Sequence, residues 1–544
     1  MAIETGTERY DFDEKSYALL DHDAFPSPRP SPAAGTMQAK RQDRTLTFRT
    51  TLLSPSPRPS PQPERFRWRL VVLRIETVFC MKKHTQPHVG STHQTVLEIT
   101  TASSTSSIRI AFTDQRLSAY GGLAVWSGFL HKCRARQNLQ KFLPHAPTSP
   151  NAFAPTDVAL GLMGGILCGA DKLSRVAYLR SDPALAEVLG IEGLPSQSTL
   201  SRFLEGFDQA ASDQLNGLHQ WAMSRLPSLP EGYTLDLDSW SLLHRDGRQE
   251  GVQCGHTPVG LKPCHRPLIA CLAEAKLVAG FWLRKGNAQC AEQTPECIEQ
   301  LLEALPKHIR IGCVRMDAGF YHEKVLQKLE QCHLHYIVKM RLYEKWQKYC
   351  RHADEAWTAT EVAGIQVQEI ESAIAGRRIL ILRQEVSQRP EAMGKELFAL
   401  PGYRFQALVS NLPASWSVLA VWRRYNGRAE SENRIKELGS QFGIKGFCCR
   451  SFWATQAVCQ LAIWAYNLCV LLQRELGLLE KVQLQTLRWR LFCRAGVWSR
   501  AQGQGTLKLA VRGEKERHWW IKIIEKLKSL LPPLNCDAVE WTKV

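Results

Sequence analysis

The feature that most constrains this chain is an acidic strand pattern at residues 233–240, Tyr-Thr-Leu-Asp-Leu-Asp-Ser-Trp. Side chains alternate along a strand, so Leu235 and Leu237 share one face while Asp236 and Asp238 share the other. A strand in the middle of an α/β sheet normally reads as an unbroken apolar run. Two carboxylates at its end therefore indicate either a solvated strand end or a site that binds a metal ion.

A second acid follows another predicted strand. Residues 311–316 have a strand pattern that runs into Asp317, and Gly319 then lets the chain turn sharply into the next helix. Ligands of α/β sheets bind at the carboxyl ends of the strands. This signal is weak alone, because acids before glycine are also common in ordinary turns.

A third group of candidates lies on a predicted helix. At about 100° per residue, Tyr425, Arg428 and Glu432 fall within roughly a 60° arc of the helix surface. Glu430 and Glu437 project elsewhere by the same geometry. The helix therefore presents Glu432 together with an aromatic side chain and an arginine. The alternative is a solvent-exposed helix face that is stabilised by ion pairs.

The acids and the net charge together favour phosphodiester chemistry. Mg²⁺ prefers oxygen ligands, and two such ions about 3.5–4 Å apart can activate a water or a 3′-hydroxyl and stabilise the leaving oxygen. The chain carries 69 Lys and Arg against 52 Asp and Glu, a net charge of +17, which indicates a polyanionic partner. The apolar stretches at 159–170 and 461–472 do not predict a transmembrane protein.

The hydrophobic pattern predicts an α/β fold in several parts. The 544 residues are enough for three or four domains. The period is helical from about residue 117 to 229 and changes to that of strands from Gly232. Residues 415–442 and 452–476 read as two long helices. We therefore expect a helical DNA-binding domain at 116–229, a catalytic core at 230–345 and 405–450, a β-rich insertion at 346–404, and a basic helical C-terminal region at 451–544.

The N-terminal segment is rich in proline. Residues 1–80 hold 9 of the 28 prolines, and Pro-Ser-Pro-Arg-Pro-Ser-Pro occurs twice, at 26–32 and 55–61. Such a sequence cannot bury a core. We expect residues 1–115 to be disordered or of low complexity, with residues 1–80 a non-native upstream extension and Met81 the true start.

Three further groups of residues have open interpretations. The segment around Gln197 and Arg202 predicts either a helix-turn-helix DNA reader or plain helical packing. Trp282, beside Arg284 and Lys285, is suited to stacking on a displaced base or to the core of a strand. The Cys and His residues at 254, 256, 264 and 265 could bind zinc, but their spacing fits no standard site.

Several motifs, taken in order, resemble one enzyme family. They are Leu235-Asp-Leu-Asp-Ser239, Gly247-Arg-Gln-Glu-Gly251, His265-Arg-Pro-Leu268, Leu283-Arg-Lys-Gly-Asn287, Arg315-Met-Asp-Ala-Gly-Phe320 and the stretch from Tyr425 to Leu438. From about Leu117 to its C-terminus, the chain resembles bacterial insertion-sequence DDE transposases, in the branch with a Tyr-Arg-Glu-Lys signature and most similar to the IS-thirteen-eighty type. Two positions depart from the pattern: Gly439 replaces the signature lysine and Trp240 replaces a threonine.

The resemblance implies an RNase H-like catalytic core interrupted by the β-rich insertion. Asp238, Asp317 and Glu432 would be the catalytic and metal-binding residues, with two Mg²⁺ or Mn²⁺ ions. The residues expected to contact DNA are Tyr425, Arg428, Arg284, Lys285 and Arg202. The partners would be terminal inverted repeats, target DNA and a second copy of the chain, in the bacterial cytoplasm at the nucleoid. The alternatives are an impaired, DNA-binding repressor and a host nuclease of the same fold.

Overall fold

The computed structural model describes residues 97–100, 107–143, 149–244, 247–351, 357–370, 376–447, 449–478 and 482–530. The chain divides into two units between Thr92 and His93, and every described residue belongs to the second. The predictions for the proline-rich segment and for Met81 therefore lie outside the described residues.

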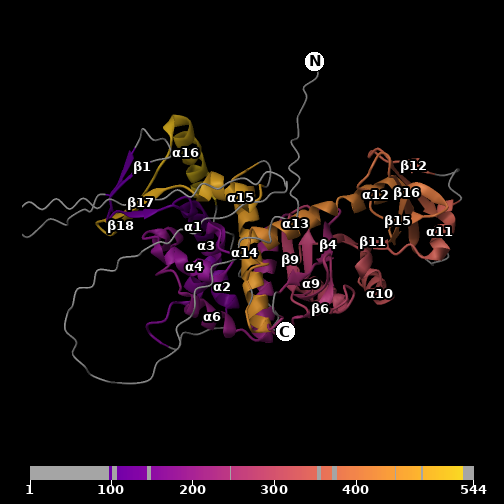
Figure 1. The fold of residues 1–544 in the computed structure, drawn as a ribbon, viewed down its shortest axis with the longest axis horizontal. Coiled ribbons are helices and arrows are strands. Elements are labelled where there is room, and N and C mark those ends of the chain that lie inside the picture. Colours follow the sequence, from indigo (N-terminus) through magenta and orange to yellow (C-terminus); the bar gives the residue numbers. More distant parts are fainter. Residues whose placement is uncertain are drawn as a thin grey trace, which may run out of the picture. The chain divides into compact units, whose positions relative to one another are not determined.

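The N-terminal part of the described chain is mainly helical (Figure 1). Its helices are α1 (Leu123–Lys132), α2 (Ala135–Phe142), α3 (Pro155–Cys168), α4 (Leu173–Tyr178), α5 (Leu185–Leu189), α6 (Gln197–Glu205), α7 (Gln209–Gln214) and α8 (Asn216–Met223). Almost all of α3 is buried. Its glycines allow close packing, because a Cβ at Gly164 would lie 2.6 Å from Leu189 and one at Gly161 2.7 Å from Pro195.

Helix α14 (Phe452–Glu475) joins these helices to the central sheet. It contacts α3, α6, α7 and α8 on the helical side and strand β9 (Leu277–Trp282) on the other. Within the part of the chain that the structure describes, α14 is the one helix long and apolar enough to cross a membrane, and its most apolar window is wholly buried in protein. Ser451 begins the helix by accepting a hydrogen bond from Ala454 N.

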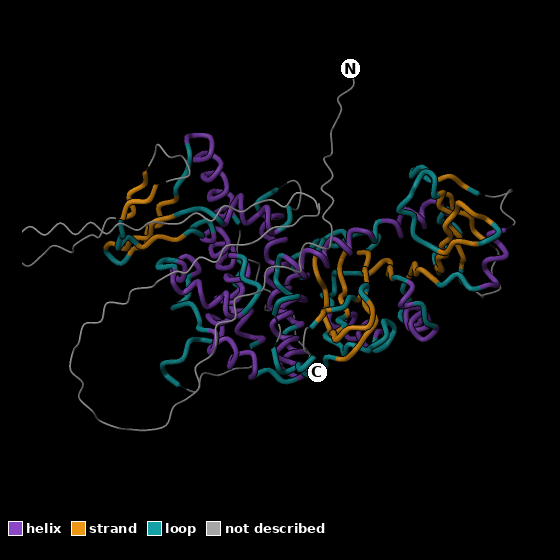
Figure 2. Tube along the Cα trace, viewed as in Figure 1, coloured by secondary structure: helices purple, strands orange, loops and turns teal. Residues whose placement is uncertain are grey.

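The central sheet, whose strands are orange in Figure 2, contains both parallel and antiparallel pairs. Strands β4 (Tyr233–Ser239), β8 (Leu268–Leu272) and β9 pair antiparallel, whereas β10 (Ile311–Met316) runs parallel to both β4 and β11 (His335–Met340). The spatial order is β9-β8-β4-β10-β11. Helix α9 (Thr294–Ala304) precedes β10, and α10 (Glu323–Gln331) connects β10 to β11. The predicted α/β class is confirmed, and the sheet is a mixed one.

The predicted β-rich insertion continues this sheet. Strand β16 (Leu400–Ser410) pairs antiparallel with β11 on one side and with β14 (Arg378–Glu385) on the other. The remaining elements are α11 (Glu344–Arg351), β12 (Thr358–Ala359), β13 (Ile365–Ile370) and β15 (Lys395–Leu397). Because β16 crosses the predicted boundary between residues 404 and 405, the insertion and the core share one strand.

The two ends of the described chain contain strands that the helical patterns did not predict. Strand β3 (Arg116–Ser118) pairs with β17 (Gly496–Ala501), which pairs with β18 (Gln504–Leu509). The C-terminal region is therefore a hairpin with helices α15 (Leu484–Leu487) and α16 (Gly513–Ser529) and a π-helical turn at Arg488–Phe492. Two further strands, β1 (Leu97–Thr100) and β2 (Ser107–Ile110), pair within the range expected to be disordered.

Candidate active site

Asp236 is the centre of a buried ion-pair cluster. Its side chain is fully buried, and Arg315 of β10 donates two hydrogen bonds to it, at 2.6 Å to Oδ1 and 2.8 Å to Oδ2. Arg434 donates a third, at 2.9 Å to Oδ2. A buried carboxylate is tolerated only when it is paired and hydrogen-bonded. This acid therefore ties two strands to the helix that carries Arg434, and both of its oxygen atoms accept hydrogen bonds from arginine.

The same Arg315 breaks the helix predicted over residues 415–442. The structure has two helices instead, α12 (Val418–Asn426) and α13 (Ala429–Ser440). Arg315 Nη1 donates to the carbonyl of Arg424, and a Cβ at Gly427 would lie only 2.7 Å from that nitrogen. Arg428 N bonds to Tyr425 O at 2.9 Å rather than to the Arg424 carbonyl. The single-helix prediction was wrong because a side chain from β10 takes a helical carbonyl.

Asp238, two residues further along β4, has a less complete environment. Arg428 Nη2 lies 2.8 Å from its Oδ2, and Ser239 N donates to its Oδ1 at 2.8 Å. The Arg428 residue is only 8% exposed, and its Nε and Nη2 have no aligned hydrogen-bond acceptor among the described residues. Arg428 is thus held near Asp238 by charge, with donors left over for an anion.

The charges of the other two predicted acids act on Asp238. Burial raises the pKa of Asp238 to about 6, the charge of Arg428 lowers it, and the charges of Asp317 and Glu432 raise it again. Asp317 caps the short 3-10 turn Ala318–Phe320 by accepting a hydrogen bond from Gly319 N at 2.9 Å. Glu432 is exposed on α13. The fold therefore brings one acid from each of β4, the end of β10 and α13 to a common region.

The donor chemistry of these acids suits a divalent cation, since carboxylate oxygens are the ligands that Mg²⁺ prefers. Across the described part of the chain, however, no three His, Cys, Asp or Glu side chains are grouped closely enough to hold an ion. Asp238 is instead paired with Arg428. Coordination by Asp238 therefore requires Arg428 to move away from its Oδ2.

The residues predicted to contact DNA have different environments. Arg202 and Lys285 are exposed, on α6 and just after β9, and Tyr425 is half-buried with its pKa raised by burial. Arg284 is 2% exposed and donates to the carbonyls of Arg266, Gln289, Cys290 and Glu292 and to Ser239 Oγ. The prediction for Arg284 is corrected, because its donors hold a loop together and are not open to DNA.

The two departures from the signature have local structural explanations. Gly439 is buried in α13, and a Cβ there would lie 2.9 Å from Cε of Lys445, whose side chain crosses the position. Trp240 packs with its ring centroid 6.2 Å from that of Phe281. Glu437, predicted to point away from the site, is buried and accepts a hydrogen bond from Leu484 N at 2.9 Å.

The zinc alternative has no support in the geometry. His265 is buried, with its Nδ1 2.9 Å from His244 Nε2 and its Nε2 2.8 Å from the carbonyl oxygen of Glu250. Both ring nitrogens are therefore occupied by hydrogen bonds. Cys264 is buried with its sulfur 3.6 Å from the Gly286 carbonyl oxygen. This cluster stabilises the small sheet of β5 (Leu242–Leu243), β6 (Gln253–Thr257) and β7 (Gly260–His265).

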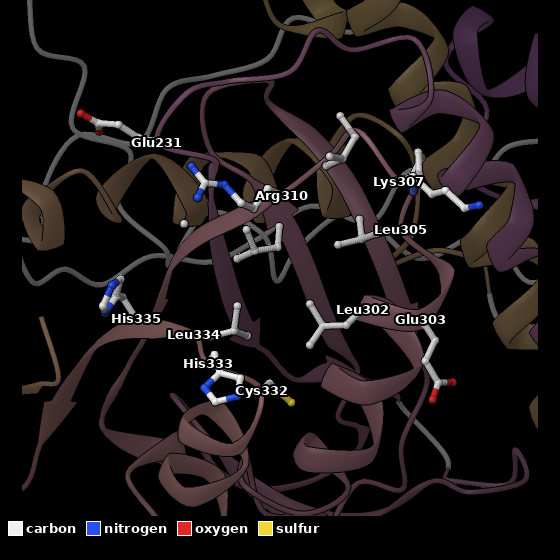
Figure 3. A pocket seen from close by; sticks show the side chains of 14 residues that line it. Glu231, Leu302, Glu303, Leu305, Lys307, Arg310, Cys332, His333, Leu334 and His335 are labelled. Carbon is white, nitrogen blue, oxygen red and sulfur yellow. The ribbon is translucent and has the colours of Figure 1, made fainter.

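A cavity of about 610 Å³ lies at the opposite end of the sheet (Figure 3). Its lining includes Lys307, Arg310, His333 and His335, at the beginning of β10 and β11. The acids lie at the carboxyl end of β4 and β10 instead. This cavity is therefore separate from the candidate active site.

Sequence analysis missed Arg315, Arg434 and Lys339 as members of this region. Arg315 stands in an otherwise apolar strand, in register with Asp236 of β4. Opposite charges on two predicted core strands are a signal for such a pair. Lys339 lies on β11, and its pKa responds to Asp317, Arg428 and Glu432.

Comparison with known proteins gives one family. The model described as "Transposase DDE domain group 1" matches residues 100–530. Among solved structures, the one titled "Cryo-EM structure of piggyBac transposase synaptic complex with hairpin DNA (SNHP)" is similar with a TM-score of 0.37 and 10% identity, over 79% of this chain and 90% of that chain. No curated protein matches the chain.

Proposed function

Because this chain belongs to the family of transposases with a group 1 DDE domain, we propose that it is a metal-dependent DNA transposase. It cleaves at the terminal inverted repeats of its element and joins the freed 3′-hydroxyl to target DNA. The observation that carries the proposal is that the charges of Asp317 and Glu432, which lie on two other elements, act on Asp238 of β4. The net charge of +17 supports a DNA substrate.

Each of the candidate residues has its own role in the proposed reaction. Asp238, Asp317 and Glu432 would hold two Mg²⁺ or Mn²⁺ ions, which, when bound, activate a water or 3′-hydroxyl and stabilise the leaving oxygen. Arg428 leaves Asp238 and pairs with a phosphate through the donors that have no acceptor in the structure. Tyr425, which packs against the apolar cluster that includes Cys313 and Ile337, contacts DNA phosphate near the same site. Lys285 and Arg202 contact the DNA backbone outside the site.

The strand order supports the finer assignment of the fold. Counted along the chain, the five core strands lie in the order 3-2-1-4-5, with the first three antiparallel and the last two parallel to the first. We propose that this is an RNase H-like core. We also propose the bacterial insertion-sequence class of the IS-thirteen-eighty type, action as a homodimer on two DNA ends, and a location at the nucleoid.

The test is strand cleavage of DNA that carries the element's own ends, with Mg²⁺ or Mn²⁺. Asp238→Asn, Asp317→Asn and Glu432→Gln should each abolish cleavage while nearly preserving DNA binding, because the basic surface stays. Glu430→Gln is the matched control, since this exposed acid lies two residues from Glu432 on another face of α13. Cleavage that survives in Asp317→Asn would exclude the proposed chemistry.

One structural observation favours a second candidate. Arg428 pairs with Asp238 and so occupies an oxygen atom that a metal ion would need. Gly439 supplies no cation to the end of α13. A repressor that occupies the repeats without cutting them has the same features. Tight repeat binding by the wild-type chain with no metal-dependent cleavage would support this candidate over the enzyme.

A further inference from the structure

The strand registers place one lysine in line with two of the acids. Arg315 pairs with Asp236 on β4 and with Ile337 on β11, and the next residue, Met316, pairs with Leu237 and Val338. If the β10–β4 register is continued by one residue, Asp317 aligns with Asp238. The β10–β11 register, continued in the same way, aligns Asp317 with Lys339. Neighbouring strands are about 4.8 Å apart, and paired residues share a face. Asp238 of β4 and Lys339 of β11 therefore form a row with Asp317, the residue that directly follows β10 between them.

The electrostatics of Lys339 agree with this placement. The side chain is half-buried, and burial lowers its pKa. The charges of Asp317 and Glu432 raise the pKa, and the charge of Arg428 lowers it. The ammonium group thus interacts with two of the three proposed metal ligands and with the arginine that pairs with the third.

Lys339 differs from the three arginines near these acids in having no carboxylate partner among the described residues. Arg315 and Arg434 are held by Asp236, and Arg428 is paired with Asp238. No ion pair joins Lys339 to a carboxylate among the described residues. A lysine carries a compact charge on a flexible four-carbon stem, so it can follow an anion that arrives at the site.

We propose that Lys339 is a catalytic residue that contacts a phosphate oxygen of the DNA strand being cut. This inference rests on the proposed function, because it assigns a role toward the same substrate. The ammonium group would neutralise charge that develops on the phosphate at the edge of the acidic row. Such a group acts more strongly where it is partly desolvated than in open water, and Lys339 is half-buried. The sequence signature does not include this position, which lies on β11 rather than on α13.

The test compares Lys339→Met, Lys339→Arg and Lys339→Gln in the full chain. Each protein is titrated with a duplex that carries the element's terminal repeat, in Ca²⁺ and over a series of salt concentrations, and its single-turnover cleavage is then measured in Mg²⁺. Lys307→Met is the matched control, because Lys307 is an exposed lysine at the opposite end of the sheet (Figure 3). Urea unfolding of each variant shows whether it is folded.

We expect Lys339→Met and Lys339→Gln to lower the slope of log affinity against log salt by about one unit. Their cleavage should be slower by about 100-fold or more, the usual cost of one charge-stabilising donor. Lys339→Arg should keep the slope and recover part of the rate, and Lys307→Met should match the wild type. An unchanged slope in both neutral variants overturns the proposal.

A structural role gives a different result. If Lys339 only balances the charge of the acids, Lys339→Met should bind Mn²⁺ more tightly with no change in the salt slope, and this outcome also overturns the proposal. The two proposals fail separately. Cleavage that persists in Asp317→Asn removes the proposed chemistry, whereas the salt slope is measured without chemistry and decides the contact of Lys339 alone.

Discussion

Asp236 and Asp238 lie two residues apart on the same face of one strand, and both are paired with arginine. Asp236 is fully buried and accepts three hydrogen bonds from two arginines. Asp238 is 6% exposed and has a single arginine whose geometry leaves donors unsatisfied. Asp236 therefore serves the fold alone. Asp238 has an incompletely hydrogen-bonded arginine partner and lies in the same region as Asp317 and Glu432.

The difference shows how a buried acidic strand can serve both structure and chemistry. The Asp236 cluster joins β4, β10 and α13, and through Arg315 it also fixes the break between α12 and α13 at Gly427. That break sets where Arg428 begins the next helix. The Asp236 cluster thus positions Arg428, which is the partner of Asp238.

The largest effect expected is on stability. Asp236→Asn leaves Arg315 and Arg434 buried without a counter-charge, so the free energy of unfolding should fall by about 3–5 kcal/mol. At pH 4, Asp238→Asn should change it by less than about 1 kcal/mol, because the folded-state carboxyl is then mostly protonated, like the neutral amide, and Asp317 still balances Arg428. Urea unfolding measures both. Equal losses in the two variants would erase the distinction between the two acids.

The pH dependence of stability sharpens the comparison. The folded-state pKa of Asp238, about 6, lies above its ordinary value of 3.8. Between these values the folded chain keeps a proton that the unfolded chain has released, so this group stabilises the fold at low pH and the stabilisation is lost as the pH rises through about 4 to 6. The loss is at most about 3 kcal/mol.

The measurement is the difference in unfolding free energy between the wild type and Asp238→Asn at pH 4, 5, 6 and 7. A difference is needed because Glu323 and Glu330, whose pKa values are lowered by Arg377, contribute the opposite slope in both proteins. A pH-independent difference would show that burial does not shift Asp238.

The link between the two acids can be tested at Gly427. A Cβ there would lie 2.7 Å from Arg315 Nη1. Gly427→Ala should therefore displace this guanidinium and lower the free energy of unfolding by about 1–3 kcal/mol. Its cleavage rate should also fall, because Arg428 moves with the break. The helix propensity of alanine alone would stabilise the chain by about 1 kcal/mol. A stabilised variant would mean that Arg315 does not hold the break.

The smallest effect concerns the end of α13. Gly439→Lys adds one cation at the signature position and must displace the Lys445 side chain. If that position faces DNA, the salt slope of binding should steepen by about one unit. Gly439→Met is the matched control, since it causes the same displacement without charge. Equal slopes for both variants would show that the signature fails at this residue.

The strands and the helix that position the candidate acids could be predicted because strand alternation and helix periodicity are local. Asp238, Asp317 and Glu432 were each found from patterns a few residues long, and the structure brings these three acids into one region. Arg284 could not be judged in the same way. Its pattern is the same whether the guanidinium contacts DNA or, as observed, the carbonyl of Arg266 and three carbonyls of the loop that follows Arg284.

The sequence by itself determined the α/β class, the strands that carry the acids, the buried α14 and the basic charge, because these depend on composition and on periodicity within single elements. Only the tertiary structure decided which of Asp236 and Asp238 is committed to an ion-pair cluster, where the α12–α13 helix breaks, and which lysine lies beside Asp317. Each of these depends on strand register and on side chains that meet from positions tens to hundreds of residues apart. Such contacts leave no periodic pattern, since the energy of a buried charge depends on all the groups that surround it.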